Sequence, residues 1–417
     1  MTLEIVRLVS VIQDSVAKLA THFESNGIPP PSFNIDVPAD LGISPDLKNI
    51  DDARISALSA CMELHDLLLG PRKLITTITN PAALQAIYRF DIASKFPIGE
   101  EISYKELSER CGLPEQDLRS LVRYAILHHR VFQEPRAGVV AHTSASKLLA
   151  ENSNVRDMVG LTAEEWAPAY TKTVDALVQF PDRKPNQTGF ALANNTEKSF
   201  YEFLSTHPAR IGRFAGAMKL LSADTGAQVR FLIDHYAWGA LGTGRVVDVG
   251  GSKGHISVKL AESFPSLRFV VQDLPDVVAG AEQLIPAEVG QRFTFMHHDI
   301  FHEQTTHGDV FLLRYILHNW PDDECIRIIR ALVPALRPGS KILINDHIIP
   351  GPGVLPLSTD RDLRAMDLRM MTIQNARERE LPEWESILHA ADSRLRIVSV
   401  KLMDHSLTGL LEVELVD

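Results

Sequence analysis

A glycine-rich turn is the first feature of this sequence that could hold a ligand. The segment VVDVGGSKGHIS places Gly250, Gly251 and Gly254 between an apolar, strand-like run and a helical pattern. Glycines in such a turn let the backbone approach a ligand closely, because no Cβ atom intervenes. Asp248 lies in the preceding run, where its carboxylate would repel a diphosphate but suits a ligand that carries an ammonium group.

Two more carboxylates follow at the ends of later strand-like runs. Asp273 ends the run in VVQDLP, a place where a carboxylate accepts hydrogen bonds from ribose hydroxyls. Asp299, in HHDIF, ends the third run and is able to accept from an adenine amine. A nucleoside with a cationic, amino-acid-like tail fits three such carboxylates better than NAD does. This pattern therefore predicts S-adenosylmethionine as the ligand.

The segments around these residues alternate between strands and helices from about residue 241 onward. Runs such as RVVDVG, RFVVQDL and KILINDHII are separated by helical stretches, which is typical of right-handed βαβ crossovers and a mostly parallel sheet. The last two runs, LRIVSVKLM and LTGLLEVELV, predict an antiparallel hairpin at the edge. We therefore predict a doubly wound α/β domain over 241–417.

The region from 93 to 150 has a different pattern. Two helical segments meet at Cys111-Gly112, and two short strand-like runs, VFQE and VVAHT, follow them. This order predicts a winged helix. Residues 101–150 carry seven basic and six acidic side chains, whereas a groove-reading element needs a clear basic excess, so a dimerisation scaffold is the preferred interpretation. We expect a dimerisation domain over 1–150 and a helical connector over 151–240 that lines the substrate pocket.

The N-terminal segment also predicts an interface. Its apolar positions Ile5, Leu8, Ile12 and Leu19 describe one face of a helix that ends at Asn26-Gly27, and the chain breaker IPPPSF follows. Such a face needs a partner surface. A second subunit, and hence a homodimer, is the partner that we expect.

Composition excludes several classes of function. The 417 residues are 45% hydrophobic, and 42 basic against 53 acidic residues give a net charge of −11, which argues against a general nucleic-acid binder. A membrane span and a basic signal region are not indicated, so we expect a cytoplasmic protein. The three cysteines lie far apart, and the adjacent histidines of 128–129 and 297–298 point in different directions, so we expect no metal.

Longer motifs resemble one family in their order along the chain. They are similar to those of the plant and fungal small-molecule O-methyltransferases of the caffeate and sterigmatocystin type: VVDVGGSKGH, RFVVQDLPDVV, HHDIF, FLLRYILHNWPDDEC, KILINDHIIPG and NARERELPEWESIL. The resemblance covers essentially the whole chain and includes VAHTSASK at 140–147. It implies a class I methyltransferase sheet, S-adenosyl-L-methionine as cofactor, and an N-terminal dimerisation domain.

The resemblance also implies roles for individual residues. The family's general base is the histidine of an L-H-[DN]-[WY] motif, which is His318 here, and two acidic residues flank it, Glu378 and Asp346. The second acidic position is usually Glu, so Asp346 is a departure. Candidate cofactor-binding residues are Asp248, Gly250, Gly251, Gly254, Asp273, Leu274, Asp299, Ile300, Arg314, Phe214 and Met218. Candidate substrate-binding residues are Met370, Asn375 and Trp384.

The proposed chemistry requires these residue types. A phenol has a pKa of about 10 and is a poor nucleophile at neutral pH. An imidazole such as His318 removes its proton as the oxygen attacks the sulfonium methyl. A carboxylate on the other ring nitrogen, from Glu378 or Asp346, fixes the tautomer and stabilises the imidazolium. Asp is one methylene shorter than Glu, so Asp346 has less reach.

The sequence therefore predicts an O-methyltransferase that acts on a phenolic hydroxyl of a polyketide-like secondary metabolite of the fungal type. Two alternatives stay open. Some fungal members of the family bind S-adenosylmethionine but catalyse dehydration or pericyclic ring closure, and Asp346 and Asn319 leave that possibility open. A winged-helix regulator that binds DNA and senses the cofactor is the other alternative.

Overall fold

The computed structural model describes residues 4–38, 41–43, 47–76, 79–223, 226–403 and 408–416. Its contacts divide the chain into two compact units, where the sequence predicted three segments. The first unit comprises Met1–Lys172, Gly189–Asp224 and Pro356–Ser358, and the second comprises Thr173–Thr188, Thr225–Leu355 and Thr359–Asp417. The expected connector is therefore shared between the two units. Among the described residues, no helix combines the length and the apolar character needed to cross a membrane.

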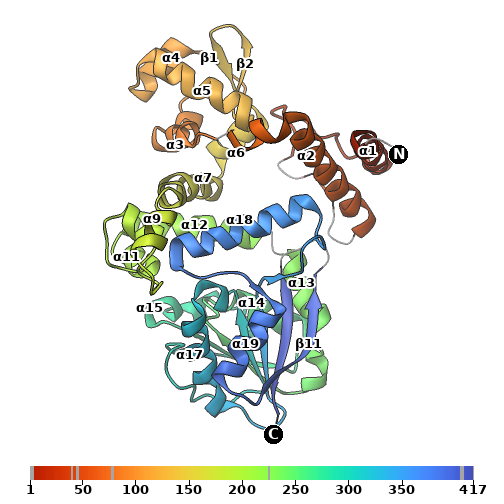
Figure 1. Ribbon diagram of the computed structural model, residues 1–417, viewed down its shortest axis with the longest axis vertical. Helices are drawn as coiled ribbons and strands as arrows, with labels where there is room; N and C mark the ends of the chain where they lie inside the picture. The colour runs from red at the N-terminus through yellow and green to blue at the C-terminus, as the bar shows by residue number, and fades with distance from the viewer. Residues whose placement is uncertain are drawn as a thin grey trace. The chain divides into compact units, whose positions relative to one another are not determined.

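The first unit is mainly helical (Figure 1). Its N-terminal helix ends at Ser25, and Gly27 follows with a φ of 61°, which confirms the predicted helix end. Its helices are α1 (Glu4–Ser25), α2 (Lys48–Thr76), α3 (Ala82–Arg89), α4 (Tyr104–Cys111), α5 (Glu115–His129), α6 (Ser144–Glu151), α7 (Ser153–Leu161), α8 (Ala167–Tyr170), α10 (Gly189–Ala193), α11 (Phe200–Ser205) and α12 (Pro208–Ala223).

The strands of a small antiparallel sheet lie on either side of the α4–α5 pair in the chain of the first unit. Strands β1 (Glu101–Ser103), β2 (Gln133–Arg136) and β3 (Val139–Ala141) pair in the order β1-β3-β2. Gly112 ends α4 in the left-handed conformation with a φ of 68°, which turns the chain into α5. The predicted order of helix, turn, helix and hairpin is thus present.

The second unit is built around a seven-stranded sheet with the strand order β11-β12-β8-β7-β4-β5-β6. Strands β6, β5, β4, β7 and β8 run parallel, and β12 and β11 add an antiparallel edge, as predicted. The strands are β4 (Arg245–Val249), β5 (Arg268–Asp273), β6 (Phe293–His297), β7 (Val310–Arg314), β8 (Lys341–Asn345), β11 (Leu395–Leu402) and β12 (Gly409–Leu415). Strand β6 ends at His297, so Asp299 lies two residues beyond the strand end predicted for it.

Helices cover both faces of this sheet. Alternate residues of β4 point to opposite sides: Val247 packs with α17 and α19, and Val246 packs with α13 and α14. This alternation explains why the strands are apolar throughout. The helices of this unit are α9 (Thr173–Gln179), α13 (Gly226–His235), α14 (His255–Ser263), α15 (Pro275–Val278), α16 (Ala287–Gly290), α17 (Asp322–Leu332), α18 (Leu357–Gln374) and α19 (Leu381–Ala391).

The carboxyl ends of the parallel strands meet at one edge of the sheet. The chain reverses its winding between β4 and β7, and the switch point of a doubly wound sheet is where ligands bind. A separate ladder of two residues per strand lies after β8, where β9 (Ile348–Ile349) pairs in parallel with β10 (Arg379–Glu380). This ladder brings together the two segments that carry Asp346 and Glu378, the acidic residues predicted to flank the base.

Candidate active site

The glycine-rich turn after β4 is tightly folded against β5. The backbone N–H groups of Gly250 and Gly251 both donate to the carbonyl of Gln272, over 2.8 and 3.0 Å. Gly250 has a φ of 73°, and a Cβ atom there would overlap with the Ile316 side chain. A Cβ atom on Gly251 would lie 2.5 Å from Cγ of Asp248. Glycine is therefore required at both positions by the packing of the turn itself, and its approach to a ligand stays a prediction.

Two of the predicted carboxylates are held beside this turn. Asp248 is buried and accepts a hydrogen bond from Oγ of Ser257 over 2.6 Å, and burial raises the pKa of its carboxyl to about 6. Asp273 accepts from the N–H groups of Ser252 and Leu274 over 2.9 and 2.8 Å, and burial raises its pKa as well. Each carboxylate oxygen of Asp273 keeps a second lone pair, so it can still accept from a ligand hydroxyl.

Three more of the predicted cofactor residues, Asp299, Ile300 and Arg314, follow or end strands at the same sheet edge. Asp299 accepts from the N–H of Phe301 over 3.0 Å, and Ile300 packs against the core. Arg314 ends β7, and its guanidinium lies beside the carboxamide of Asn345 and over the Tyr315 ring. Burial lowers the pKa of Arg314.

Three other predicted cofactor residues are Leu274, Phe214 and Met218. The side chain of Leu274 is 53% exposed, so a bound ligand could cover it. Phe214 and Met218 both lie on α12 of the first unit, where Phe214 packs edge to face on Phe200. Contact of α12 with the cofactor stays a prediction.

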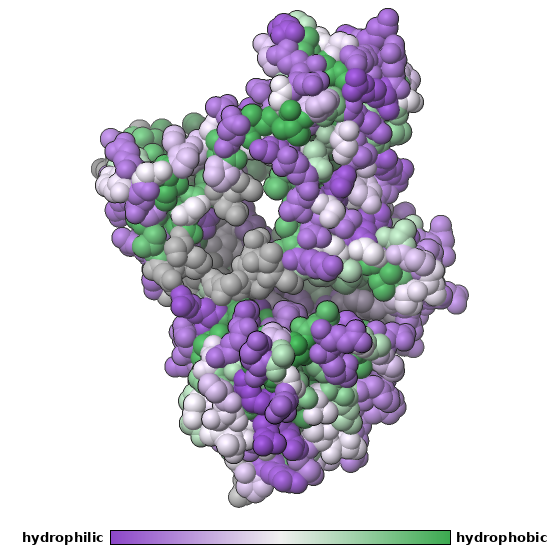
Figure 2. Space-filling model, turned by 180° about the vertical axis from the view of Figure 1, so that it is seen from behind, coloured by the Kyte–Doolittle hydropathy of each residue, from purple (hydrophilic) through white to green (hydrophobic). Residues whose placement is uncertain are grey.

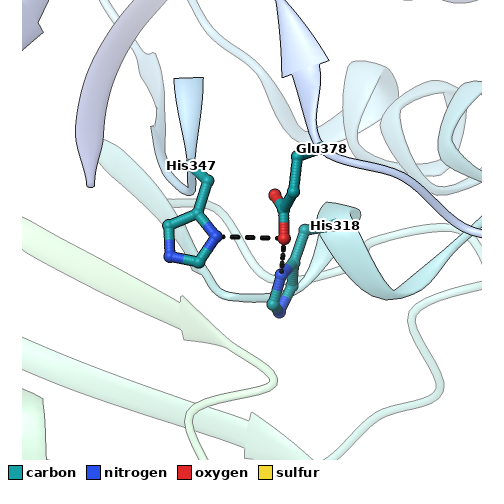
Figure 3. Close-up of side chains that lie close together, drawn as sticks. All are labelled: His318, His347 and Glu378. Atoms are coloured by element: carbon teal, nitrogen blue, oxygen red, sulfur yellow. Dashed lines mark hydrogen bonds and ion pairs between the residues drawn. The ribbon is translucent and has the colours of Figure 1, made fainter. Parts of the chain in front are cut away.

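His318 sits on the short 3-10 turn η5 (Leu317–Asn319) that follows β7. Its Nδ1 atom lies 3.1 Å from Oε1 of Glu378, which comes directly before β10 (Figure 3). The carboxylate of Glu378 is fully buried, whereas the His318 side chain is 12% exposed. Burial lowers the pKa of His318, but the Glu378 carboxylate more than offsets this and sets the pKa above its ordinary value.

Asp346 lies near this pair but has another contact. Its Oδ2 atom accepts from the backbone N–H of Leu317 over 3.2 Å, and Oδ1 has no hydrogen-bond partner among the described residues. Burial raises the pKa of the Asp346 carboxyl. The sequence left two acids as possible partners of the imidazole. In the structure Glu378 contacts the ring, whereas Asp346 binds the backbone of the turn.

Sequence reasoning missed two residues that fix the His318 turn. Arg379 is fully buried, and its guanidinium donates to the carbonyls of Leu317 and Trp320 over 3.2 and 2.7 Å. Cys325 donates from its thiol to the same Leu317 carbonyl over 3.1 Å. The position of Arg379 directly after Glu378 in the sequence was a signal that could have indicated the contacts of this arginine.

The predicted substrate residues differ in what their side chains contact. Met370 lies on α18 and is buried. Asn375 donates both amide hydrogens, to the carbonyls of Lys184 and Gln187, over 2.8 Å each. Trp384 is fully buried in the core of the second unit. These contacts favour structural roles for Asn375 and Trp384 over the substrate contacts predicted for them.

A second histidine lies at the Glu378 carboxylate, and the sequence analysis did not single it out. Nδ1 of His347 lies 3.0 Å from the same Oε1 atom that His318 approaches. One potential ligand atom from each of His318, His347 and Glu378 lies within 4.8 Å of the others, so the residue types and spacing also match those of metal ligands. The expectation of a metal-free protein stays a prediction.

The fold and the site together define a class of protein. The mostly parallel seven-stranded sheet is that of a methyltransferase-like α/β fold. Residues 198–393 match the family model of the O-methyltransferase domain. The chain is 41% identical over 411 residues to the grayanic acid biosynthesis cluster O-methyltransferase of Cladonia grayi, an alignment that covers 98% of this chain and 87% of that protein. The chain therefore belongs to the O-methyltransferase family, and it is an S-adenosylmethionine-dependent O-methyltransferase.

Solved structures share the fold. That of OxaC in complex with SAH and oxaline aligns with a TM-score of 0.75 and 22% identity, covering 99% of this chain and 100% of that one. A structure described as a pericyclic reaction enzyme aligns with a TM-score of 0.69 and 21% identity, covering 97% of this chain and 100% of that one. At this level of identity the two structures establish the fold alone, and the relative at 41% identity carries the functional assignment.

Proposed function

We propose that this protein methylates a phenolic hydroxyl of a polyketide-like secondary metabolite, with His318 as general base. The observation that carries the proposal is the contact between Nδ1 of His318 and the buried Glu378 carboxylate. A proton on Nδ1 is held by this contact, so Nε2 keeps its lone pair for the substrate. In Figure 3 the second ring nitrogen of His318 points away from Glu378.

The residues around the glycine-rich turn suit the cofactor. We assign the ammonium group to Asp248, the ribose hydroxyls to Asp273 and the adenine amine to Asp299, because each carboxylate lies at the edge where the strands end. Glycine at 250 and 251 lets the turn lie directly against Ile316 and Asp248, which keeps the turn beside these carboxylates. S-adenosylmethionine supplies an electrophilic methyl group on a positively charged sulfur.

The proton of the substrate has a defined destination. As the O–C bond forms and the S–C bond breaks, the phenolic proton moves to Nε2 of His318, and the imidazolium is stabilised by Glu378. Asp346, Arg379 and Cys325 hold the backbone on either side of His318, so the ring keeps its position during this transfer.

We also propose that the protein forms a homodimer through its N-terminal helices. The predicted face is partly used within the chain, because α1 packs on α2 and Leu8 is buried. A neighbouring stripe of α1, formed by Ile5, Val9 and Val16, stays 40% to 50% exposed. Figure 2 shows green patches on this helix pair. An exposed apolar stripe of this kind suits an interface with a second copy.

The test is a stoichiometric one. The purified protein is incubated with S-adenosylmethionine and a panel of phenols, and both products are quantified by mass spectrometry. We expect one S-adenosylhomocysteine for each product that is heavier by one CH₂ unit. Conversion of a substrate without formation of S-adenosylhomocysteine would contradict methyl transfer and favour the pericyclic reaction.

A further inference from the structure

The Glu378 carboxylate is shared by two imidazole rings. Its Oε1 atom lies 3.1 Å from Nδ1 of His318 and 3.0 Å from Nδ1 of His347. The two rings meet edge to face, with centroids 5.7 Å apart, and both point their Nδ1 atoms at the same oxygen (Figure 3). The three residues come from separate segments, namely the turn after β7, the residue before β9 and the residue before β10. The parallel β9–β10 ladder brings His347 and Glu378 together.

Sharing the oxygen has a direct chemical consequence. The His318 contact is a hydrogen bond, whereas Nδ1 of His347 lies at ion-pair distance from Oε1 and has no hydrogen-bond partner among the described residues. A carboxylate oxygen has two lone pairs, so Oε1 has a lone pair left for a proton on this nitrogen. The negative charge of Glu378 is then shared between the two rings, so each ring is stabilised less by Glu378 than a single ring would be. Burial opposes ionisation of Glu378, but His318 and His347 together hold the pKa of its carboxyl at about 2.

The other charged groups at these rings are few and have their own contacts. Asp346 faces His318 from the segment after β8 and accepts from the backbone of Leu317. Arg379 faces it from β10, and its guanidinium is bound to backbone carbonyls and to Asp322. The Tyr315 ring packs on both imidazoles, and its hydroxyl is paired with Oγ1 of Thr408. Asp346 also interacts electrostatically with both histidines, but among the described residues Glu378 is the group with an atom within 3.1 Å of both rings.

We propose that His347 is a positioning residue for methyl transfer, which shares the Glu378 carboxylate with His318, holds that carboxylate in place and keeps His318 able to accept the substrate proton. The proposal rests on the proposed role of His318 as general base. If His347 is removed, the whole charge of Glu378 acts on His318. The imidazolium form of His318 is then stabilised, and a higher pH is needed to obtain the neutral base.

The test uses two substitutions with different consequences. His347→Leu removes the ring, whereas His347→Asn keeps a neutral N–H donor near the position of Nδ1. For His347→Leu we expect the acidic limb of the kcat against pH profile to move up by about one pH unit, because a strongly coupled partner is lost. The affinity for S-adenosylmethionine, measured by calorimetry, should stay unchanged. His347→Asn should restore part of the kcat on the alkaline plateau.

A second measurement does not require turnover. The imidazole signals of His318 are followed by NMR in ¹⁵N-histidine-labelled protein and assigned with a His318 variant; we expect His347→Leu to raise the pH at which His318 titrates. His307→Leu is the matched control, since this ring lies before β7 and contacts the carbonyl of Ala335. All buffers contain EDTA, because the three side chains could bind stray metal ions.

The outcomes separate this proposal from the proposed function. Two results would overturn the role of His347 and leave methyl transfer unaffected. One is a His318 titration that is unchanged in His347→Leu. The other is a kcat that falls by the same factor at every pH and is not restored by His347→Asn. A shifted titration in His347→Leu supports the sharing of Glu378 even if His318→Ala retains full activity, a result that would instead contradict the general base. Thermal unfolding of each variant checks that it is folded.

Discussion

The backbone N–H of Leu317 donates a hydrogen bond to Oδ2 of Asp346 over 3.2 Å, so this acid supports the turn that carries the candidate base and not the base itself. The imidazole of His318 relies on Glu378 instead. Because Glu378 contacts the ring and Asp346 contacts the backbone, position 346 can hold Asp although the family usually has the longer Glu there. A carboxylate with shorter reach is sufficient for a backbone contact.

The two acids should therefore respond differently to substitution. Asp346→Asn keeps an acceptor for the Leu317 N–H, so we expect kcat to stay within about threefold of the native value, whereas Glu378→Gln removes the charge that stabilises the imidazolium and should lower kcat by about a hundredfold. Asp346→Leu leaves the N–H unpaired and should lower the free energy of unfolding by about 1–3 kcal/mol relative to Asp346→Asn. Steady-state kinetics and urea unfolding measure these effects. Equal losses of kcat in Asp346→Asn and Glu378→Gln would contradict the assignment.

The buried guanidinium of Arg379 predicts a test of the turn itself. Arg379→Lys keeps the charge, but an ammonium group cannot reproduce the planar set of bonds to Leu317, Trp320 and Asp322. We expect the free energy of unfolding to fall by about 1–3 kcal/mol and kcat to fall about tenfold. Arg377→Lys is the matched control, because Arg377 pairs with the same Asp322 but is 44% exposed. A loss in the control as large as that in Arg379→Lys would show that the buried contacts are not decisive.

Burial of Asp248 predicts that cofactor binding depends on pH. The pKa of its carboxyl is raised to about 6, so the group is protonated below that pH and loses its attraction for an ammonium ion. We expect the affinity for S-adenosylmethionine to fall by up to about tenfold per pH unit below pH 6. The contribution of Asp248 to the stability of the fold changes with pH in the opposite direction. The folded state binds the Asp248 proton more tightly than the unfolded state, so this contribution to the free energy of unfolding rises as the pH falls from about 6 towards 4.

Calorimetry between pH 5 and 8 measures this dependence. Asp248→Asn should bind more weakly and lose most of the pH dependence, whereas Asp276→Asn, at an exposed position near the same turn, should retain it. An affinity of the native protein that is constant from pH 7 to 5 would exclude the contact between Asp248 and the ammonium group.

The sequence was most informative where local pattern determines structure. The strands that contain Asp248 and Asp273 follow from apolar runs, and the glycine turn between them follows from φ angles that glycine favours. The contacts of His347 and Arg379 were missed because they depend on the β9–β10 ladder, which has two residues per strand and no recognisable pattern. Asn375 likewise bonds to carbonyls nearly two hundred residues away, a partnership that spacing cannot reveal.

The exposed stripe on α1 predicts the behaviour of the protein in solution. Val9→Glu combined with Val16→Glu places two charges on the apolar surface, and we expect a dimer in the native protein and a monomer in this variant, because a buried charge is costly. Val178→Glu is the control, since Val178 on α9 is 82% exposed. Deletion of residues 1–27 should also dissociate the dimer or lower solubility. Light scattering that finds the native protein monomeric at micromolar concentration would refute the homodimer.

The role of His318 leads to the most direct prediction for activity. His318→Ala should lower kcat by about a hundred- to ten-thousandfold with little change in the affinity for S-adenosylmethionine. The pKa of His318 lies above its ordinary value because of Glu378, so kcat of the native enzyme should rise with pH through the neutral range. The deficit of His318→Ala should shrink as the pH approaches the phenol pKa of about 10, because an ionised substrate no longer needs a base. His307→Ala, at a ring that contacts Ala335, should keep the native profile. A deficit of the same size at every pH would mean that His318 supports the site without removing the proton.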